Sequence, residues 1–337
     1  MSFPIDRQNE RTLAADFAGD VVTCDIDRTY LATRFSSLKG LMRIPFEFGV
    51  DKKDIAGMVV LLKELRRGPE VRSRHTPLYF VSASPASLRG VIERKMLLDG
   101  LEYDGTTFKD WGRCLRSRRF HRLREQLGYK VTALLTGRSE MPRAASELLF
   151  GDDLESDALA FCTYADLVSG RISAGAAPPL LESLGVAADD AAHAAGLAMK
   201  VVGGRGVRRS YIRLERHTPE HFLEFSPHLR ACRGAFQLAC GLLDDGAIGK
   251  DAVVRVASDL VERGESSGTI QERLVDAVTR GIIAPELAEG LFEALAGASL
   301  VVPAGAHLPA EAAAEWIAQR AGALPERYLA GLSPARA

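Results

Sequence analysis

Four short apolar runs constrain the fold most, because segments with helical periodicity separate them. The runs are Val21–Cys24, Leu78–Val81, Leu148–Phe150 and Tyr211–Leu214. Between the first two lies the segment 54–67, in which Ile55, Met58, Leu62 and Leu65 recur at helical spacing. Strands that alternate with helices form a parallel sheet with helices on both faces. We therefore expect an α/β fold with a Rossmann-like sheet.

From about position 218 the pattern changes to almost continuous helical periodicity, and several helical segments end at a glycine. The segments are 227–246, 250–264, 269–281, 285–297 and 310–322. An alanine-rich insertion, 173–196, precedes the last apolar run. We expect two domains, an α/β domain over 1–217 and an all-α C-terminal region over 218–337.

Composition excludes some classes of protein and cellular location. The formal net charge of −1 gives no reason to expect a nucleic-acid partner. No apolar stretch reaches membrane-spanning length, and the N-terminus is too charged for a signal peptide. Five dispersed cysteines without a CxxC pair argue against a zinc knuckle or a disulfide framework and favour a reducing compartment. We expect a soluble, cytoplasmic protein.

The charge is uneven along the chain, with a basic middle over 61–130 and an acidic C-terminal part. The basic segment 113–126, "RCLRSRRFHRLREQ", has two interpretations. It is either a solvated helix face or a surface for an anionic substrate or membrane headgroups. Peripheral membrane contact therefore stays open.

Acidic and hydroxyl side chains follow three of the four apolar runs. Asp25 and Asp27 end the first run and Ser82 ends the second, while the third leads into "GDDLESD", which carries Asp152, Asp153 and Asp157. Open parallel sheets place their functional residues at the carboxyl ends of the strands. Each like-charged pair at about 4 Å costs on the order of 4 kcal/mol at an effective dielectric constant near 20. A hard divalent cation such as Mg²⁺ would remove that cost.

These residue types are suited to phosphoryl transfer. One carboxylate can attack a phosphoryl group and form an aspartyl-phosphate. A second carboxylate, two residues further on, can protonate the leaving oxygen and later deprotonate water. A hydroxyl group and a lysine can hold the phosphoryl oxygens, and a cation shares their charge.

In these four places the sequence resembles the haloacid dehalogenase (HAD) superfamily of hydrolases. "DIDRT" resembles its first motif, "YFVSASP" its second and "GDDLESD" its fourth, and Lys130 matches the lysine of its third. The resemblance implies that Asp25 is the nucleophile and Asp27 the general acid/base. It also implies that Thr29, Ser82, Ala83 and Lys130 bind the substrate. Mg²⁺ would be bound by Asp25, the main-chain carbonyl of Asp27 and Asp152, supported by Asp153 or Asp157.

A closer resemblance is to the phosphatidate phosphatase family first found in actin-patch proteins, over roughly residues 18–216. "DIDRT", "VSASP" and "GDDLESDALAF" are similar to its signature "DIDDT … VSxSP … GDSGxxDPExY", with departures that include Arg28. The resemblance implies a Mg²⁺-dependent phosphatase of phosphatidate or a related phospholipid. The intervals between the motifs leave no room for a large cap domain.

Three alternatives remain open at this point. The first concerns the function: either the substrate is a soluble small molecule or a phosphoprotein instead of a lipid, or the chain is a catalytically idle scaffold that binds a partner. Lys109 is the rival of Lys130 for the lysine of the site. The C-terminal helices either cover the cleft or bind a protein partner, including a second copy of the chain.

Overall fold

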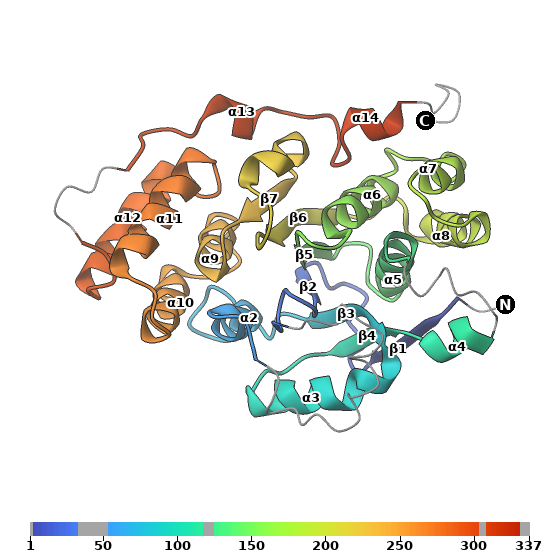
Figure 1. Ribbon diagram of the computed structural model, residues 1–337, viewed down its shortest axis with the longest axis horizontal. Helices are drawn as coiled ribbons and strands as arrows, with labels where there is room; N and C mark the ends of the chain where they lie inside the picture. Colours follow the sequence, from blue (N-terminus) through green and yellow to red (C-terminus); the bar gives the residue numbers. More distant parts are fainter. Residues whose placement is uncertain (1–2, 33–52, 117–124, 303–307, 331–337) are drawn as a thin grey trace.

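The computed structural model describes residues 3–32, 53–116, 125–302 and 308–330 and contains a seven-stranded sheet, ordered β1-β4-β3-β2-β5-β6-β7 (Figure 1). The strands are β1 (Ile5–Asn9), β2 (Asp20–Asp25), β3 (Leu78–Pro85), β4 (Gly105–Lys109), β5 (Ser146–Asp152), β6 (Gly206–Arg213) and β7 (Leu229–Cys232). All neighbours pair in parallel except β1, which runs antiparallel to β4. The predicted α/β fold is confirmed, and each of the four predicted strands is present.

Helices connect the strands and cover both faces of the sheet. Along the α/β part these are α2 (Met58–Arg67), α3 (Arg89–Leu98, preceded by the 3₁₀ turn η3, Ala86–Leu88), α4 (Trp111–Arg116), α5 (Leu127–Ser139), α6 (Asp157–Ser169), α7 (Ala177–Ser183) and α8 (Ala188–Val201). Further on come η5 (Pro219–Phe225), α9 (Ala235–Asp244), α10 (Lys250–Glu262), α11 (Ser267–Thr279), α12 (Pro285–Gly297), α13 (Ala314–Ile317) and α14 (Glu326–Leu329). The alanine-rich insertion forms α7 and most of α8.

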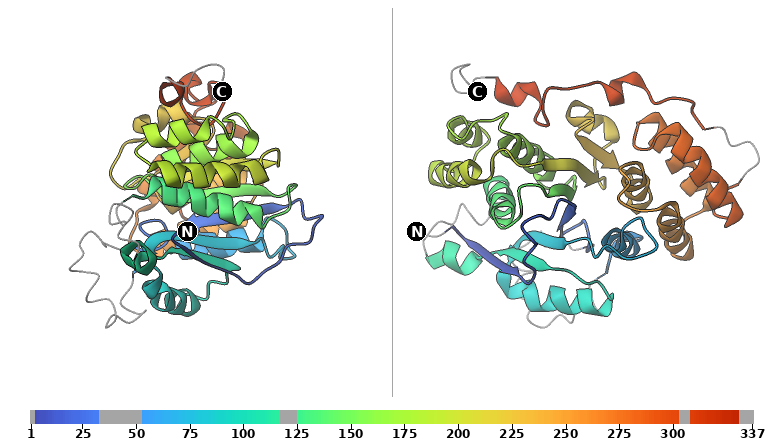
Figure 2. Two further views of the ribbon diagram at one scale, coloured as in Figure 1. Left: turned by 90° about the vertical axis from the view of Figure 1, so that its right-hand side faces the viewer. Right: turned by 180° about the vertical axis from the view of Figure 1, so that it is seen from behind.

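Side chains of the central strands alternate between two hydrophobic clusters. Leu148 and Phe150 of β5 face a cluster with α2, α3 and the helices α9 to α12, whereas Leu149 faces a cluster with α5 to α8. The two groups of helices therefore lie on opposite faces, as the two views of Figure 2 also show. Strands buried on both faces read as continuous apolar runs, which is why these strands were predictable.

The sheet and its core extend past position 218, into the region predicted to be all helix. Residues 229–232, predicted to lie in a helical segment, form β7, which pairs in parallel with β6. The first cluster also joins Val22 of β2 and Leu62 of α2 to Leu274 of α11 and Leu291 of α12. The C-terminal helices are thus packed on the α/β part through a shared core.

The predicted helix over 310–322 is reduced to the four residues of α13. The backbone groups of this segment bond elsewhere: Ala313 N–H donates to the carbonyl of Thr279, and the carbonyl of Trp316 accepts from Ser226 Oγ. Tertiary partners have replaced the bonds of a longer helix. The segment runs back from α12 across η5 and α6 (Figure 1).

Two stretches of interest fall outside the described residues. They are 33–52, between the first and second motifs, and 117–124, the middle of the basic segment 113–126. In the parts of the chain that are described, each helix is too short or too polar to span a membrane.

Candidate active site

The site forms at the carboxyl end of β2, the central strand of the sheet. Asp25 is the last residue of β2, is only 3% exposed, and pairs with Val81 of β3. On its other side β2 pairs with β5, so that Cys24 lies opposite Phe150. Because all three strands run in parallel, their carboxyl ends meet at one edge. That edge is where the sequence places its acidic and hydroxyl residues.

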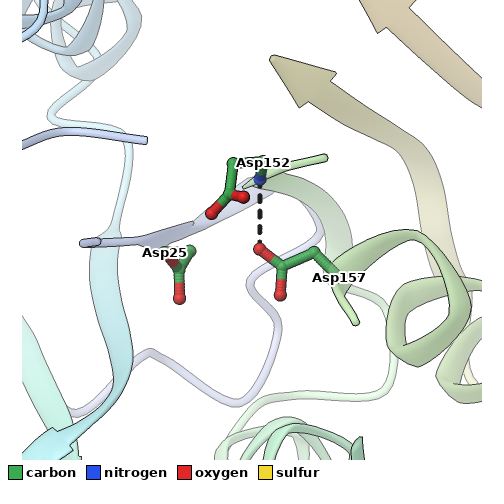
Figure 3. Close-up of side chains that lie close together, drawn as sticks. All are labelled: Asp25, Asp152 and Asp157. Carbon is green, nitrogen blue, oxygen red and sulfur yellow. Dashed lines mark hydrogen bonds between the residues drawn. The ribbon is translucent and has the colours of Figure 1, made fainter. Parts of the chain in front are cut away.

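Three buried carboxylates come together there. Figure 3 shows Asp25, Asp152 at the end of β5, and Asp157 at the start of α6. One carboxylate oxygen of each lies within 4.8 Å of the other two. Asp157 Oδ2 accepts a hydrogen bond of 3.1 Å from the backbone N–H of Asp152. The predicted convergence of these three residues is present.

Gly151 allows Asp157 to approach the strand. A Cβ atom at position 151 would lie 2.4 Å from Asp157 Oδ2, far inside the contact distance. Any residue larger than glycine would therefore push the Asp157 carboxylate away from Asp25 and Asp152. The Gly-Asp pair of "GDDLESD" thus builds the site through both its residues.

Lys130 of α5 is the cation of the site. Its Nζ lies 3.0 Å from Asp25 Oδ1 and 2.8 Å from Glu155 Oε2, and it contacts Asp157 Oδ1. The rival lysine, Lys109, donates instead to the backbone carbonyl of Glu125 and lies over the ring of Tyr129. Of the two lysines, Lys130 is the one in contact with the carboxylates.

One lysine faces four acidic side chains, and the pKa values reflect this imbalance. Burial, only partly offset by Lys130, raises the pKa of Asp25 well above its ordinary value. Burial and the charge of Asp157 raise the pKa of Asp152 to about 7. Burial opposes the charged form of Lys130, but the carboxylates of Asp157, Asp25 and Glu155 outweigh it and raise the pKa of Lys130. Among the described residues, these four acidic side chains share a single lysine.

The carboxylate oxygens of this cluster are suited to bind a divalent cation. Apart from the ion pair of Asp25 with Lys130, neither carboxylate oxygen of Asp25 accepts a hydrogen bond from a described residue, and Asp152 Oδ2 accepts none either. Burying a carboxylate oxygen that accepts no hydrogen bond costs free energy, unless a cation binds that oxygen. An all-oxygen set of this kind suits a hard divalent cation.

Asp27 lies beside the cluster and is held by β3. Its Oδ2 accepts hydrogen bonds from Ser82 Oγ (2.8 Å) and Ser84 Oγ (2.7 Å). The two serines are two residues apart, so a strand directs both to the same side. Ser82 and Asp27 are thus brought together as predicted. Ser84 was missed, although its spacing from Ser82 was visible in "VSASP".

The other two predicted substrate-binding residues are Thr29 and Ala83. Thr29 is completely buried, and among the described residues its Oγ1 has no hydrogen-bond partner. Ala83 is half-buried, and its carbonyl accepts a hydrogen bond from Trp111 Nε1. Glu155, by contrast, contacts Lys130 but was not singled out. Its position inside the acidic fourth motif is the feature of the sequence that could have indicated it.

Asp153 does not belong to the carboxylate cluster. Its two carboxylate oxygens accept hydrogen bonds from the backbone N–H groups of residues 215, 216 and 217, at 2.6 to 2.9 Å. The side chain is thus engaged in fixing the loop after β6 beside Asp152. Of the five predicted metal ligands, the structure brings together the carboxylates of Asp25, Asp152 and Asp157.

Comparisons with known proteins add no further constraint: no family model, no curated protein and no solved structure matches this chain. The chemistry of the site is therefore argued from its residues.

Proposed function

We propose that the protein is a Mg²⁺-dependent phosphomonoesterase that forms an aspartyl-phosphate on Asp25. The observation that carries the proposal is the meeting of Asp25, Asp152, Asp157 and Lys130 at the carboxyl ends of β2 and β5. A structural protein gains nothing from three carboxylates within 4.8 Å of one another in its interior. A phosphatase needs them for a cation and a nucleophile.

Asp25, Asp152 and Asp157 would hold the cation, together with the main-chain carbonyl of Asp27. When bound, Mg²⁺ neutralises negative charge on the phosphoryl oxygens. The carboxylate oxygens of Asp25 and Asp152 that accept no hydrogen bond from a described residue support this assignment. So does the ratio of charges among the described residues, where one lysine balances one of four acids.

The residues divide the reaction between them in two steps. In the first, a carboxylate oxygen of Asp25 bonds to phosphorus, the bond from phosphorus to the ester oxygen breaks, and Asp27 gives its proton to that oxygen. In the second, Asp27 removes a proton from water, whose oxygen attacks phosphorus. The phosphorus bond to Asp25 then breaks and releases inorganic phosphate.

Lys130 and Ser82 have supporting roles in this mechanism. Lys130 holds Asp25 in place and lowers the cost of charge on the phosphoryl oxygens. The hydroxyls of Ser82 and Ser84 orient Asp27, which fixes the position from which its proton is delivered. When the substrate binds, the hydroxyl proton of Ser82 would turn from Asp27 to a phosphoryl oxygen, while Ser84 would keep its hydrogen bond to Asp27.

The proposed place of action is the cytoplasm. All five cysteines are free and buried, which suits a reducing compartment. Phosphatidate is the first lipid to assay as a substrate, because the motifs of the chain resemble the signature of phosphatidate phosphatases. A soluble phosphate ester is the alternative within the same reaction, and an idle scaffold is the alternative outside it.

Phosphate release tests the reaction. It should be measured from phosphatidate in detergent micelles and from 4-nitrophenyl phosphate, with Mg²⁺ and with EDTA. Turnover should require Mg²⁺ and fall at least about a thousandfold in Asp25→Asn, because a nucleophile is lost. Asp20→Asn is the matched control, since Asp20 starts the same strand at its other end. No Mg²⁺-dependent turnover of either ester would contradict the proposal, and turnover of the aryl ester alone would contradict only the lipid.

A further inference from the structure

Arg28 follows Asp27 directly and has an unusual backbone conformation. Its φ angle of 59° lies in the left-handed region, which costs a residue with a side chain roughly 1–2 kcal/mol. Two hydrogen bonds hold this turn: Arg28 N–H donates to the carbonyl of Leu31 (2.7 Å), and the carbonyl of Arg28 accepts from Arg213 Nε (2.7 Å). Strain of this kind persists where the surroundings fix a residue, often at a functional site.

The turn is anchored to the candidate active site from two directions. Arg28 is three residues after Asp25, so their Cα atoms lie within about 11 Å of each other. Arg213, which holds the Arg28 carbonyl, lies opposite Asp152 in the register of β5 and β6. The guanidinium of Arg28 is therefore carried by a fixed turn next to the carboxylate cluster.

The guanidinium of Arg28 already binds a carboxylate. Its Nη1 lies 3.1 Å from Glu215 Oε1, and Arg213 Nη2 contacts the other oxygen of Glu215. The side chains of Arg28 and Glu215 are 27% and 41% exposed, and ion pairs that are exposed to this degree are worth less than about 1 kcal/mol. An anionic group of a ligand can displace Glu215 from Arg28 at little cost.

We propose that Arg28 recognises a second anionic group on the substrate. The preferred substrate is then a phosphomonoester that also carries a carboxylate or another phosphate. This inference rests on the proposed phosphatase reaction. Two guanidiniums, those of Arg28 and Arg213, contact the carboxylate of Glu215, so an anionic group that took its place would meet two arginines. Arginine is suited to the task because its planar fork matches a carboxylate or a phosphate.

A matched pair of soluble esters tests the proposal. 3-Phosphoglycerate and glycerol 3-phosphate have the same skeleton and differ in one group, which is a carboxylate in the first and a hydroxymethyl in the second. The wild type should have the higher kcat/KM for 3-phosphoglycerate. Arg28→Ala should lower that value about tenfold to a hundredfold, mainly through KM, and change the value for glycerol 3-phosphate by less than about threefold.

Two further variants separate recognition from structure. Arg28→Lys should lose less than Arg28→Ala, because it keeps the charge without the fork. Glu215→Gln should lower KM for 3-phosphoglycerate, because the competing carboxylate is gone. Arg208→Ala is the matched control. Its side chain is 33% exposed and also pairs with one carboxylate, that of Asp20, but it lies towards the amino end of β6.

A second pair identifies the source of the anion. Phosphatidate and phosphatidylinositol 4-phosphate, in the same micelles, differ in whether the lipid carries a further anionic group beside the phosphomonoester. Selective dependence on Arg28 in either pair supports the proposal, and the pair that shows it distinguishes a soluble substrate from a lipid headgroup. Equal losses for both members of both pairs, or no loss in either, overturn it while leaving the phosphatase intact. Hydrolysis of 4-nitrophenyl phosphate without turnover of any of these four esters overturns this proposal alone. Absence of turnover of all five esters overturns the phosphatase as well.

Discussion

Asp152 is a buried carboxyl group whose pKa is raised to about 7, by burial first and by Asp157 second. In the unfolded chain its pKa is close to the ordinary value of 3.8. Between about pH 4 and pH 7 the folded protein thus binds a proton that the unfolded chain has released. In the absence of metal, the contribution of Asp152 to the free energy of unfolding therefore falls as the pH rises through this window.

Asp152→Asn should therefore stabilise the metal-free protein. At pH 7 we expect the free energy of unfolding to rise by on the order of 2–4 kcal/mol, because the variant no longer buries a charge there. Urea denaturation in EDTA at pH 5 and pH 8 measures this, and the gain should be larger at pH 8. With Mg²⁺ present the order should reverse, since the wild type keeps a ligand that the variant lacks. A variant less stable than wild type in EDTA would contradict this explanation.

Lys130→Met should have the opposite effect. Removing the lysine leaves the carboxylates of Asp25, Asp157 and Glu155 without their cation and should cost about 3–5 kcal/mol in EDTA. Saturating Mg²⁺ should restore part of the loss. Lys109→Met is the control, because Lys109 is equally buried but bonds a backbone carbonyl, so Mg²⁺ should not rescue it. Equal rescue of both variants would show that the cation binds elsewhere.

The sequence sufficed for some residues of the site and not for others. Asp25 and Asp152 were predictable, because parallel strands must end at a common edge. The environment of Asp153 was not, since its partners lie 62 to 64 positions further on and the packing of the loop after β6 decides its direction. The ion pair of Arg28 could not be predicted for the same reason, because its partner Glu215 is 187 positions away.

At the scale of elements, the strands that the sequence did not predict lie at the edges of the sheet or next to an edge. β1 and β7 are its two edges, and β4 lies next to β1. They have five, four and five residues, and β1 ("IDRQN") is mostly polar. Outer strands take much of their stability from pairing with a neighbour, which leaves little apolar pattern to detect. The central strands carry that pattern, and all of them were found.

Within the C-terminal segment, residues 308–330, the backbone near position 323 is bound by one side chain of α6. Asp166 accepts hydrogen bonds from the backbone N–H groups of Ala323 and Leu324, both at 2.9 Å, and pairs with Arg171. This buried carboxylate replaces the hydrogen bonds that a helix would have supplied to the segment. Asp166 should therefore contribute strongly to the order of the end of this segment, next to the packing of Ala323 and Leu324.

Asp166→Ala should release the C-terminal segment without unfolding the sheet. Limited trypsin digestion should then cut after Arg320 and Arg327 at least about tenfold faster than in the wild type, because local opening exposes the backbone. Glu326→Ala is the control, since Glu326 is 78% exposed and its pair with Arg171 contributes little. Mass spectrometry of the fragments measures both. Unchanged cutting in Asp166→Ala would show that other contacts hold the segment.

At the scale of the whole molecule, the helices after position 218 complete the core of the α/β part. α2 buries Met58, Leu61, Leu62 and Leu65 in the cluster that also contains α9 to α12. Polar contacts reinforce the packing: Arg255 bonds both oxygens of Glu64, at 2.7 and 2.8 Å. Without α9 and α10, the apolar face of α2 would lie in water.

A chain ending at residue 217 should therefore not fold by itself. The full chain should unfold in one cooperative transition, whereas the 1–217 fragment should lose its near-ultraviolet circular dichroism and expose apolar surface. Thermal unfolding of both chains, followed by near- and far-ultraviolet circular dichroism, measures this. A fragment with a sharp transition of its own would show that the α/β part is an independent domain.

The central claim is that Asp25 forms the bond to phosphorus, and trapping the intermediate tests it most directly. Wild-type protein should be mixed with a phosphate ester and Mg²⁺, quenched in acid and reduced with borohydride, which converts an aspartyl-phosphate to homoserine. Peptide mass spectrometry then locates the altered residue. We predict homoserine at position 25 in the wild type and none in Asp25→Asn. Turnover without homoserine at position 25, or with homoserine at position 27, would contradict the mechanism.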